Sequence, residues 1–183
     1  MKVNKTQIDG LFEIECPKIE DDRGEFSRFF CVEELATVLS DRTIVQVNYS
    51  KTNQKGSIRG MHYQIAPFME TKLVRCTQGE VFDVAVDLRK ESRTFLHWYG
   101  TKLNSENNKM LLIPEGFAHG FQSLEANSTM LYLHTATYAP ECERGIRFDD
   151  PLIDIKWPNL PADISEKDKN QAFMDKNFMG ISV

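Results

Sequence analysis

Hydrophobic and polar residues alternate along the middle of the chain, which is the pattern of half-buried β-strands. The alternation is clearest over residues 81–88, where the even-numbered residues, all hydrophobic, fall on one face of an extended chain. Further strands are predicted at 43–49, 57–64, 72–78, 95–103, 109–113, 120–124 and 129–137. Many short strands separated by Gly, Pro, Asn or Ser are typical of a sandwich or barrel rather than of βαβ units. We therefore predict an all-β fold of the jelly-roll type.

The flanks of this strand-rich region carry weaker patterns. A short alternation over residues 12–16 predicts an edge strand or an arm that two subunits exchange, and helical spacing predicts a surface helix at 32–40. Ser165 is predicted to open a short helix that runs through Met174. We expect one domain over 1–183, with an N-terminal arm at 1–20, a barrel core at about 43–138 and a C-terminal extension at about 139–183.

Composition narrows the classes of function. The net charge is -5, and no run of Lys or Arg forms the basic stripe of a non-specific nucleic-acid binder. The four cysteines have no CxxC spacing, which favours reduced thiols. No segment is long and apolar enough for a membrane span or a signal peptide core, so we expect a cytoplasmic protein without a membrane or nucleic-acid partner.

Residues 59–64, with the sequence Arg-Gly-Met-His-Tyr-Gln, place a cation and an imidazole on a predicted buried strand. A buried charge or imidazole needs a partner to offset its desolvation. His62 is therefore either a satisfied structural histidine or a functional group. Arg59 and His62 are three positions apart, so a regular strand would point them to opposite faces, and a bulge at Gly60 would bring them to one face.

The histidines argue against a metal centre. There are only four, and Tyr63 and Gln64 follow His62 where a metal-binding barrel of this kind has an HxH pair. His119, within residues 114–120, resembles the second half of the cupin motif. Without a metal or another cofactor, chemistry here depends on acid–base groups, and His62 is the candidate base. The carboxylate that orients it is Asp83, Asp87 or Asp168, and Asp168 has the alternative role of capping a helix with Ser165.

Several motifs occur in the order found in the dTDP-4-dehydrorhamnose 3,5-epimerase family, and the chain resembles that family from about Asp21 to Asp168. The matching motifs are residues 59–64, 72–74, 79–89, 114–121, 150–151 and 165–168. The resemblance implies a homodimeric cupin jelly roll without metal that epimerises a 4-keto-6-deoxy sugar carried on a nucleoside diphosphate. The usual setting of this isomerase reaction is the synthesis of a deoxysugar for a surface polysaccharide.

The resemblance also implies roles for individual residues. His62 is the base, Asp168 orients it, Tyr132 is the opposing acid and Lys72 stabilises the charge that develops on the C4 oxygen. Tyr132 has the alternative reading of a packing residue, and His134, which shares its strand face, is the alternative polar group. Substrate contacts are implied for Arg23, Gln46, Asn48, Arg59, His119, Glu143 and Lys167, with the cations near the diphosphate, and Tyr138 is expected to stack on the base.

The chain departs from the family at three positions. Arg28 stands where the family has a Glu, so we expect Arg28 near the nucleotide base, while Leu133 replaces a usual Lys and Thr137 a usual aromatic. An arginine only donates hydrogen bonds, which suits cytosine better than thymine. Thymidine is the expected nucleotide, and a CDP-sugar epimerase or an enzyme that inverts only C3 or C5 is the alternative. A non-catalytic sugar-nucleotide-binding cupin and a metal-dependent cupin are alternatives of other classes.

Overall fold

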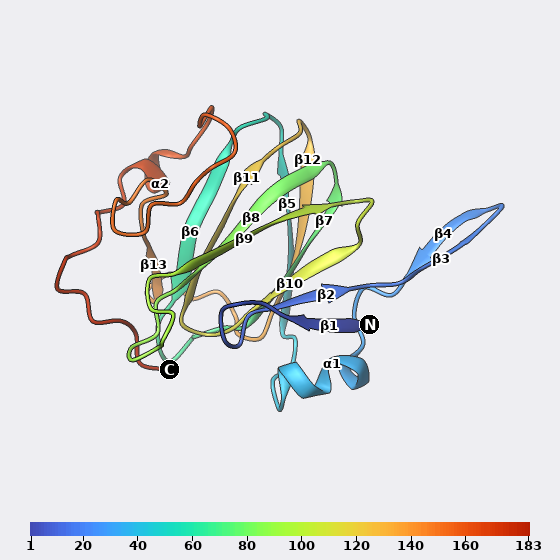
Figure 1. Cartoon of the computed structure of the whole chain (residues 1–183), viewed down its shortest axis with the longest axis horizontal. Helices are drawn as coiled ribbons and strands as arrows, with labels where there is room; N and C mark the ends of the chain where they lie inside the picture. The colour runs from blue at the N-terminus through green and yellow to red at the C-terminus, as the bar shows by residue number, and fades with distance from the viewer.

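Two antiparallel β-sheets lie face to face in the computed structural model, which describes residues 1–183 (Figure 1). The six-stranded sheet contains, in spatial order, β1 (Lys2–Lys5), β2 (Phe12–Glu15), β10 (Lys109–Ile113), β7 (Lys72–Gln78), β12 (Ser128–His134) and β5 (Gln46–Thr52). The five-stranded sheet contains β13 (Glu143–Gly145), β6 (Ile58–Gln64), β11 (Phe117–Ser123), β8 (Glu80–Asp87) and β9 (Trp98–Asn104). The prediction of an all-β jelly roll is confirmed.

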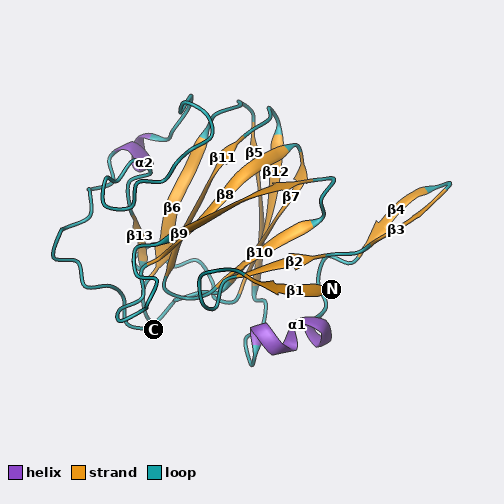
Figure 2. Cartoon of the chain, viewed as in Figure 1, coloured by secondary structure: helices purple, strands orange, loops and turns teal.

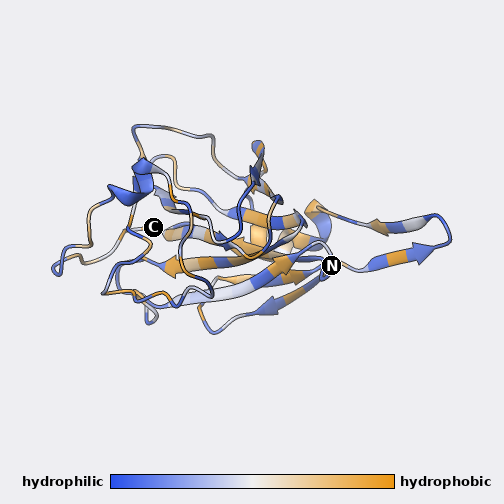
Figure 3. Cartoon of the chain, turned by 90° about the horizontal axis from the view of Figure 1, so that it is seen from above, coloured by the Kyte–Doolittle hydropathy of each residue, from blue (hydrophilic) through white to orange (hydrophobic).

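The remaining elements lie outside the two sheets. β3 (Lys18–Asp21) and β4 (Gly24–Ser27) form a hairpin that projects away from the body of the molecule (Figures 1 and 3). Helix α1 (Val32–Leu39) and the single turn α2 (Glu166–Lys169) are the only α-helices (Figure 2). The N-terminal strands β1 and β2 join the six-stranded sheet of their own chain, with β1 at its edge.

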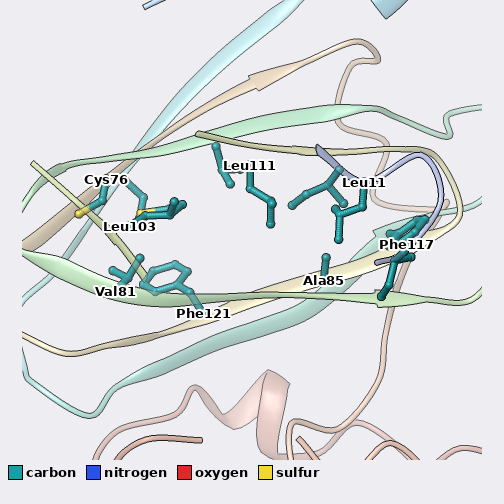
Figure 4. Packing of buried hydrophobic residues seen from close by; sticks show 12 residues of the cluster. Leu11, Cys76, Val81, Ala85, Leu103, Leu111, Phe117 and Phe121 are labelled. Carbon is teal, nitrogen blue, oxygen red and sulfur yellow. The ribbon is translucent and has the colours of Figure 1, made fainter. Parts of the chain in front are cut away.

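Both faces of β8 are buried, which explains why its sequence is so apolar. The odd-numbered Val81 and Ala85 point between the sheets, into a core cluster that also contains Leu111 and Phe121 (Figure 4). The even-numbered residues pack on the other side against the C-terminal extension, including Ile153. The alternation therefore separates two cores rather than a core from solvent.

Further layers cover the outer faces of the sandwich. Leu35 and Leu39 of α1 pack on the outer face of the six-stranded sheet, and the segment after β13 covers the outer face of the five-stranded sheet. This segment contains only one helical turn, so the predicted helix through Met174 is wrong in length. The chain leaves the helix because tertiary contacts take over: the backbone N–H of Met174 donates to the carboxylate of Asp150 at 2.6 Å.

Strand boundaries agree closely for β6, β7 and β10 and differ elsewhere. β11 begins at Phe117, three residues before the predicted start, because the turn ends at Gly116, which has φ +81°. β11 is a central strand between β6 and β8, so pairing on both sides extends it. β5, β9 and β12 are each shifted or shortened by up to a few residues, because pairing partners and not side-chain patterns set strand ends.

The predicted bulge at Gly60 is confirmed. His119 pairs with His62 and Phe121 pairs with Arg59, so β6 uses one more residue than β11 over the same distance. Gly60 has φ +110°, and a Cβ at this position would lie 2.6 Å from the Cα of Gly120. Only glycine fits this close approach, and the extra residue turns His62 and Arg59 to the same side of the sheet.

Candidate active site

A cavity of about 600 Å³ opens between the two sheets, beside the apolar core. Its two walls come from different sheets. β6 and β11 of the five-stranded sheet supply Arg59, His62 and His119 to one wall, which we call the dyad wall. The facing wall, which we call the phenol wall, comes from the six-stranded sheet and its flanking loop and carries Asn48, Ser50, Glu70, Lys72, Tyr132 and His134.

His62 and Asp168 form a close pair in the dyad wall. The Nε2 of His62 lies 2.7 Å from Oδ1 of Asp168, and the backbone N–H of Gly60 donates to Oδ2 at 3.3 Å. The imidazole is 32% exposed and the carboxylate 5%, so the ring reaches the cavity while its partner is shielded from water. Burial opposes ionisation of Asp168, but the hydrogen bonds from His62 and Gly60 outweigh it and lower the pKa of this carboxyl.

Asp168 makes both contacts considered for it in the sequence, one with Ser165 and one with His62. Its backbone N–H donates to Oγ of Ser165 at 3.1 Å, which caps the turn α2, while its side chain turns back to His62. The cap and the histidine contact are therefore compatible. The short helical turn fixes the carboxylate against β6, and with Nε2 engaged by Asp168, Nδ1 is the ring nitrogen of His62 that remains to accept a proton.

The other two candidate carboxylates have different partners. Asp83 binds the buried His119 through contacts of 2.9 and 3.1 Å to Nε2. Asp87 lies outside the cavity lining and accepts hydrogen bonds from Arg89, Ser92 and Thr94. Of the three aspartates, only Asp168 contacts His62.

Tyr132 faces the cavity from β12. Its hydroxyl lies 2.9 Å from Oγ of Ser50, its ring meets the ring of His119 edge-on at 6.3 Å, and burial raises its pKa. The phenol therefore keeps its proton near neutral pH. Its hydroxyl has one hydrogen-bond partner, Ser50, on the same sheet. Tyr132 also packs against the apolar core, so its packing and polar readings coexist.

Lys72, His134 and Glu70 form a polar cluster in the phenol wall. Oε1 of Glu70 lies 3.0 Å from Nζ of Lys72, and Oε2 lies 2.6 Å from Nδ1 of His134. His134 lines the same cavity as Tyr132 and does not replace it. Lys72 is 9% exposed and lines the cavity, which agrees with the role that the family resemblance implies for it.

Most of the expected substrate-contacting residues line the cavity or contact a residue that lines it. Glu143 accepts hydrogen bonds from the hydroxyl of Tyr138 at 2.7 Å and from Nζ of Lys167 at 2.6 Å. Gln46 accepts from the backbone N–H of Tyr138 at 3.0 Å. The ring of Tyr138 is exposed, and the guanidinium of Arg59 is held by Thr52 and the carbonyl of Lys51. Arg59, Tyr138 and Glu143 thus line one cavity, and Gln46 and Lys167 contact residues of its lining.

Arg23 and Arg28 do not belong to this group within one chain. Arg23 lies at the tip of the β3–β4 hairpin, where it pairs with Asp21, and neither arginine lines the cavity. Arg28 pairs with Glu34 of α1. Their contact with the substrate stays a prediction, because the β3–β4 hairpin points away from the sheets of its own chain (Figure 1).

Sequence reasoning missed Glu70 and Ser50. Glu70 lies in the loop before β7, where no motif marks it. Its separation of two positions from Lys72 is the signal that was present, because residues two apart share a face once the chain is extended. Ser50 shares the inner face of β5 with Asn48 by the same spacing.

No group of three or more His, Cys, Asp or Glu side chains is arranged to hold a metal ion. Neither helix has the length and apolar character needed to cross a membrane. The chemistry that the residues themselves offer is proton transfer: a carboxylate-backed imidazole in one wall faces a protonated phenol in the other, and the ammonium of Lys72 lines the same cavity.

Comparisons with known proteins agree with this arrangement. The family model described as dTDP-4-dehydrorhamnose 3,5-epimerase matches residues 5–176. A protein of Shigella flexneri described by the same words is 43% identical over 97% of this chain and 99% of its own length. A relative from Streptomyces niveus, 33% identical over 93% of this chain and 82% of its own, is described as a dTDP-4-dehydrorhamnose 3-epimerase.

A solved structure of a related enzyme has the same fold. The crystal structure of dTDP-6-deoxy-D-glucose-3,5-epimerase from Legionella pneumophila Philadelphia 1 superposes with a TM-score of 0.92 at 38% identity, covering 100% of this chain and 98% of that one. That enzyme was crystallised in complex with dTDP-4-keto-L-rhamnose.

Proposed function

Because this chain belongs to the dTDP-4-dehydrorhamnose 3,5-epimerase family, we propose that its two cavity walls carry out that family's reaction by exchanging protons with a sugar bound between them. The chain is an isomerase of deoxysugar nucleotide biosynthesis that epimerises a 4-keto-6-deoxy sugar on a nucleoside diphosphate. The observation that carries the assignment of residues is the pairing of His62 with Asp168 opposite Tyr132.

The first step is removal of a proton beside the ketone. Nδ1 of His62 takes the proton from C3 or C5, the C–H electrons form a C=C bond to C4, and the carbonyl electrons move to the C4 oxygen. The carboxylate of Asp168, kept ionised by its hydrogen bonds, stabilises the imidazolium that results. The ammonium of Lys72 offsets the negative charge on the C4 oxygen, where preorganised charge contributes most.

The second step returns a proton to the opposite face. The O–H bond of Tyr132 breaks as a new C–H bond forms, and the electrons of the enolate return to C4 as a carbonyl. The configuration is inverted because the donor stands on the wall facing the base. The tyrosinate left behind is a strong base in its buried site, since burial raises the pKa of Tyr132, and it recovers a proton before the next turnover.

Two side chains that line the cavity, Arg59 and Tyr138, fit a nucleoside diphosphate. Arg59 offers a planar fork of donors for a phosphate, and the exposed ring of Tyr138 offers a surface for a base. We propose thymidine as the nucleotide and inversion at both C3 and C5. The support is that the more similar relatives are described as 3,5-epimerases of a dTDP-sugar, whereas the relative described as a 3-epimerase is less similar.

We further propose a homodimer formed through the β5 edge and the β3–β4 hairpin. β5 is the outermost strand of its sheet, and Val47 and Tyr49 on it are 58% and 76% exposed. Phe26 on the hairpin is 65% exposed. Exposed apolar side chains on an edge strand, whose outer side has no pairing strand, are typical of a subunit interface. A hairpin contributed by a second copy would also bring Arg23 towards the cavity, which its own fold does not do.

Incubation in deuterated water tests the reaction. The purified chain is supplied with dTDP-4-keto-6-deoxyglucose or its CDP counterpart, and NMR locates the deuterium. Label at C3 and C5 of the dTDP-sugar with inverted configuration is expected, and label at one carbon would reduce the reaction to a single epimerisation. Binding without any exchange would favour the alternative of a non-catalytic sugar-nucleotide-binding protein.

Light scattering tests the dimer. The wild type should have twice the mass of one chain, and Val47→Lys should shift it towards the monomer because a charge replaces an apolar side chain in the proposed contact. Leu160→Lys is the matched control, since Leu160 is also exposed but belongs to the C-terminal extension and to neither β5 nor the hairpin. A wild-type monomer would contradict the proposal.

A further inference from the structure

Glu70 is a buried carboxylate in the cavity wall for which the reaction described above has no use. Its side chain is 8% exposed, although it lies in the loop between β6 and β7. The loop is fixed where Glu70 ends it: Thr71 donates its backbone N–H to Oγ1 of Thr135 at 2.8 Å, and Thr135 returns a backbone hydrogen bond at 3.1 Å. Glu70 is therefore held on a rigid edge of the sheet.

Its two oxygens have two different partners. Oε1 accepts from Nζ of Lys72 and Oε2 accepts from Nδ1 of His134, at 3.0 and 2.6 Å. Burial opposes ionisation of Glu70, but the contacts with His134 and Lys72 outweigh it and lower the pKa of the carboxyl. Lys72 and His134 are paired positions on neighbouring strands, so one carboxylate bridges two strands of the phenol wall.

The contact with Glu70 also determines the form of the His134 ring. A carboxylate only accepts, so Nδ1 of His134 must carry the proton. In the neutral ring, Nε2 then has a free lone pair, and the side-chain nitrogen of Asn48 lies 3.3 Å from it. A chain of hydrogen bonds thus runs from Glu70 through His134 to Asn48, whose amide oxygen is left for a ligand.

We propose that Glu70 is a positioning residue for the epimerisation, which fixes the ammonium of Lys72 at the C4 oxygen and, through the Nδ1–H form of His134, turns the amide of Asn48 so that it accepts a hydrogen bond from the sugar. The proposal rests on the proposed function. It assigns a task to His134 as well, because without this ring the carboxylate and Asn48 are not connected.

The physical reason is the freedom of lysine. An ammonium on a flexible stem can point in many directions, and its help to a developing oxyanion depends on where it stands before the reaction. A buried carboxylate on a rigid loop removes that freedom. Because the charge on the C4 oxygen is largest in the transition state, losing the alignment lowers kcat more than it changes KM.

Two variants of Glu70 should lower kcat by different amounts. Glu70→Gln keeps the shape and leaves one acceptor for two donors, and Glu70→Met removes both acceptors. We expect kcat to fall roughly tenfold in the first variant and more in the second, below the ~10²–10³ loss typical of removing an oxyanion donor, with KM changed by less than about threefold. Glu141→Gln is the matched control. Glu141 is exposed and lies two positions before Glu143, but it is not part of the cavity lining.

A double-mutant cycle tests the connection through His134. The amide nitrogen of an asparagine can replace Nδ1 of His134, whereas that of a glutamine replaces Nε2. We expect His134→Asn to keep the contact with Glu70 and lose Asn48, and its loss in kcat should multiply only in part with that of Glu70→Gln, which also releases Lys72. Losses that multiply in full, or a Glu70→Gln variant with wild-type kcat, would overturn the proposal.

Nitrogen NMR provides a readout that does not depend on turnover. The chain has only four histidines, so ¹⁵N-labelled histidine gives few signals and single substitutions assign them. The wild type should have His134 protonated at Nδ1, and Glu70→Met should shift the proton to Nε2. A wild type protonated at Nε2 would refute the role of Glu70. If instead the wild type exchanges no deuterium, the proposed function fails, while the nitrogen signals still decide whether Glu70 sets the tautomer.

Discussion

The two walls of the cavity hold their polar groups in opposite ways. In the dyad wall each imidazole has its own carboxylate, His62 with Asp168 and His119 with Asp83. In the phenol wall Tyr132 has only the hydroxyl of Ser50, and a single carboxylate serves two other groups. The pKa of Asp168 is lowered and that of Tyr132 is raised. An ionised carboxylate therefore supports proton acceptance on one side, and a neutral phenol offers a proton on the other.

Within the dyad wall, exposure separates two similar pairs. The ring of His62 is 32% exposed and that of His119 only 5%, although both have an aspartate within hydrogen-bond distance. Proton transfer to a substrate requires contact with it, so the carboxylate alone does not make a base. The bulge at Gly60 is what turns His62 towards the opening.

The largest expected effect is the loss of the base. His62→Asn should reduce epimerisation by about 10²–10⁴-fold and abolish deuterium exchange at both carbons, because the other imidazole of that wall, His119, is only 5% exposed. NMR of the sugar after incubation in deuterated water measures both quantities. His97→Asn is the control, since His97 is exposed and lies outside the cavity lining. Exchange that survives in His62→Asn would transfer the role of base to another residue.

The next largest effect should come from the phenol wall and should differ in kind. Tyr132→Phe removes the acid but leaves the base, so we expect inversion to fall by about 10²-fold while exchange with solvent continues on the face of His62. Comparing the rate of deuterium entry with the rate of product formation measures the difference. Tyr99→Phe removes a partly buried hydroxyl that contacts Glu13 and lies outside the cavity lining, and should keep inversion. Equal loss of exchange and inversion would contradict the division of roles.

Asp168→Asn should have a smaller effect on catalysis and a measurable one on stability. We expect kcat to fall roughly tenfold, because the imidazolium loses its counter-charge. The pKa of Asp168 is lowered in the folded state from its ordinary 3.8, so its contribution to stability is present above that value and is lost as the pH falls through the lowered pKa. Urea unfolding should find the variant less stable than wild type near neutral pH, with a difference that shrinks on acidification. A difference that is constant with pH would mean that the carboxylate contributes no charge interaction.

The sequence predicted the dyad wall better than the phenol wall. His62 and the bulge at Gly60 were deduced because a glycine and a three-residue separation leave a trace in the sequence, whereas Asp168 was one of three candidate aspartates until the family resemblance selected it. Glu70 was missed because its position depends on how a loop enters β7, and the hydrogen bonds that hold the loop come from Thr135 on another strand. Long-range pairing of this kind has no local pattern.

The same contrast holds for the fold. The alternation over β8 predicted one apolar face but not what covers it, since the C-terminal extension packs on that face without a regular pattern. The helix predicted through Met174 ended after one turn for the same reason: contacts with Asp150 decided its length, and propensity did not. No pattern in the sequence indicated that the hairpin carrying Arg23 projects away from its own sheets (Figure 3).

The smallest expected effect separates the helix cap from the dyad it supports. Ser165→Ala removes the oxygen that accepts the backbone N–H of Asp168 and should cost about 1 kcal/mol of unfolding free energy. Asp168 keeps its hydrogen bonds to His62 and Gly60, so kcat should fall by much less than in Asp168→Asn. Ser165→Asp, which restores an accepting oxygen at the cap, should recover the stability. If Ser165→Ala lowers kcat as strongly as Asp168→Asn, the turn and not the carboxylate contact holds His62 in place, and the dyad wall depends on its backbone in the way that the phenol wall depends on Glu70.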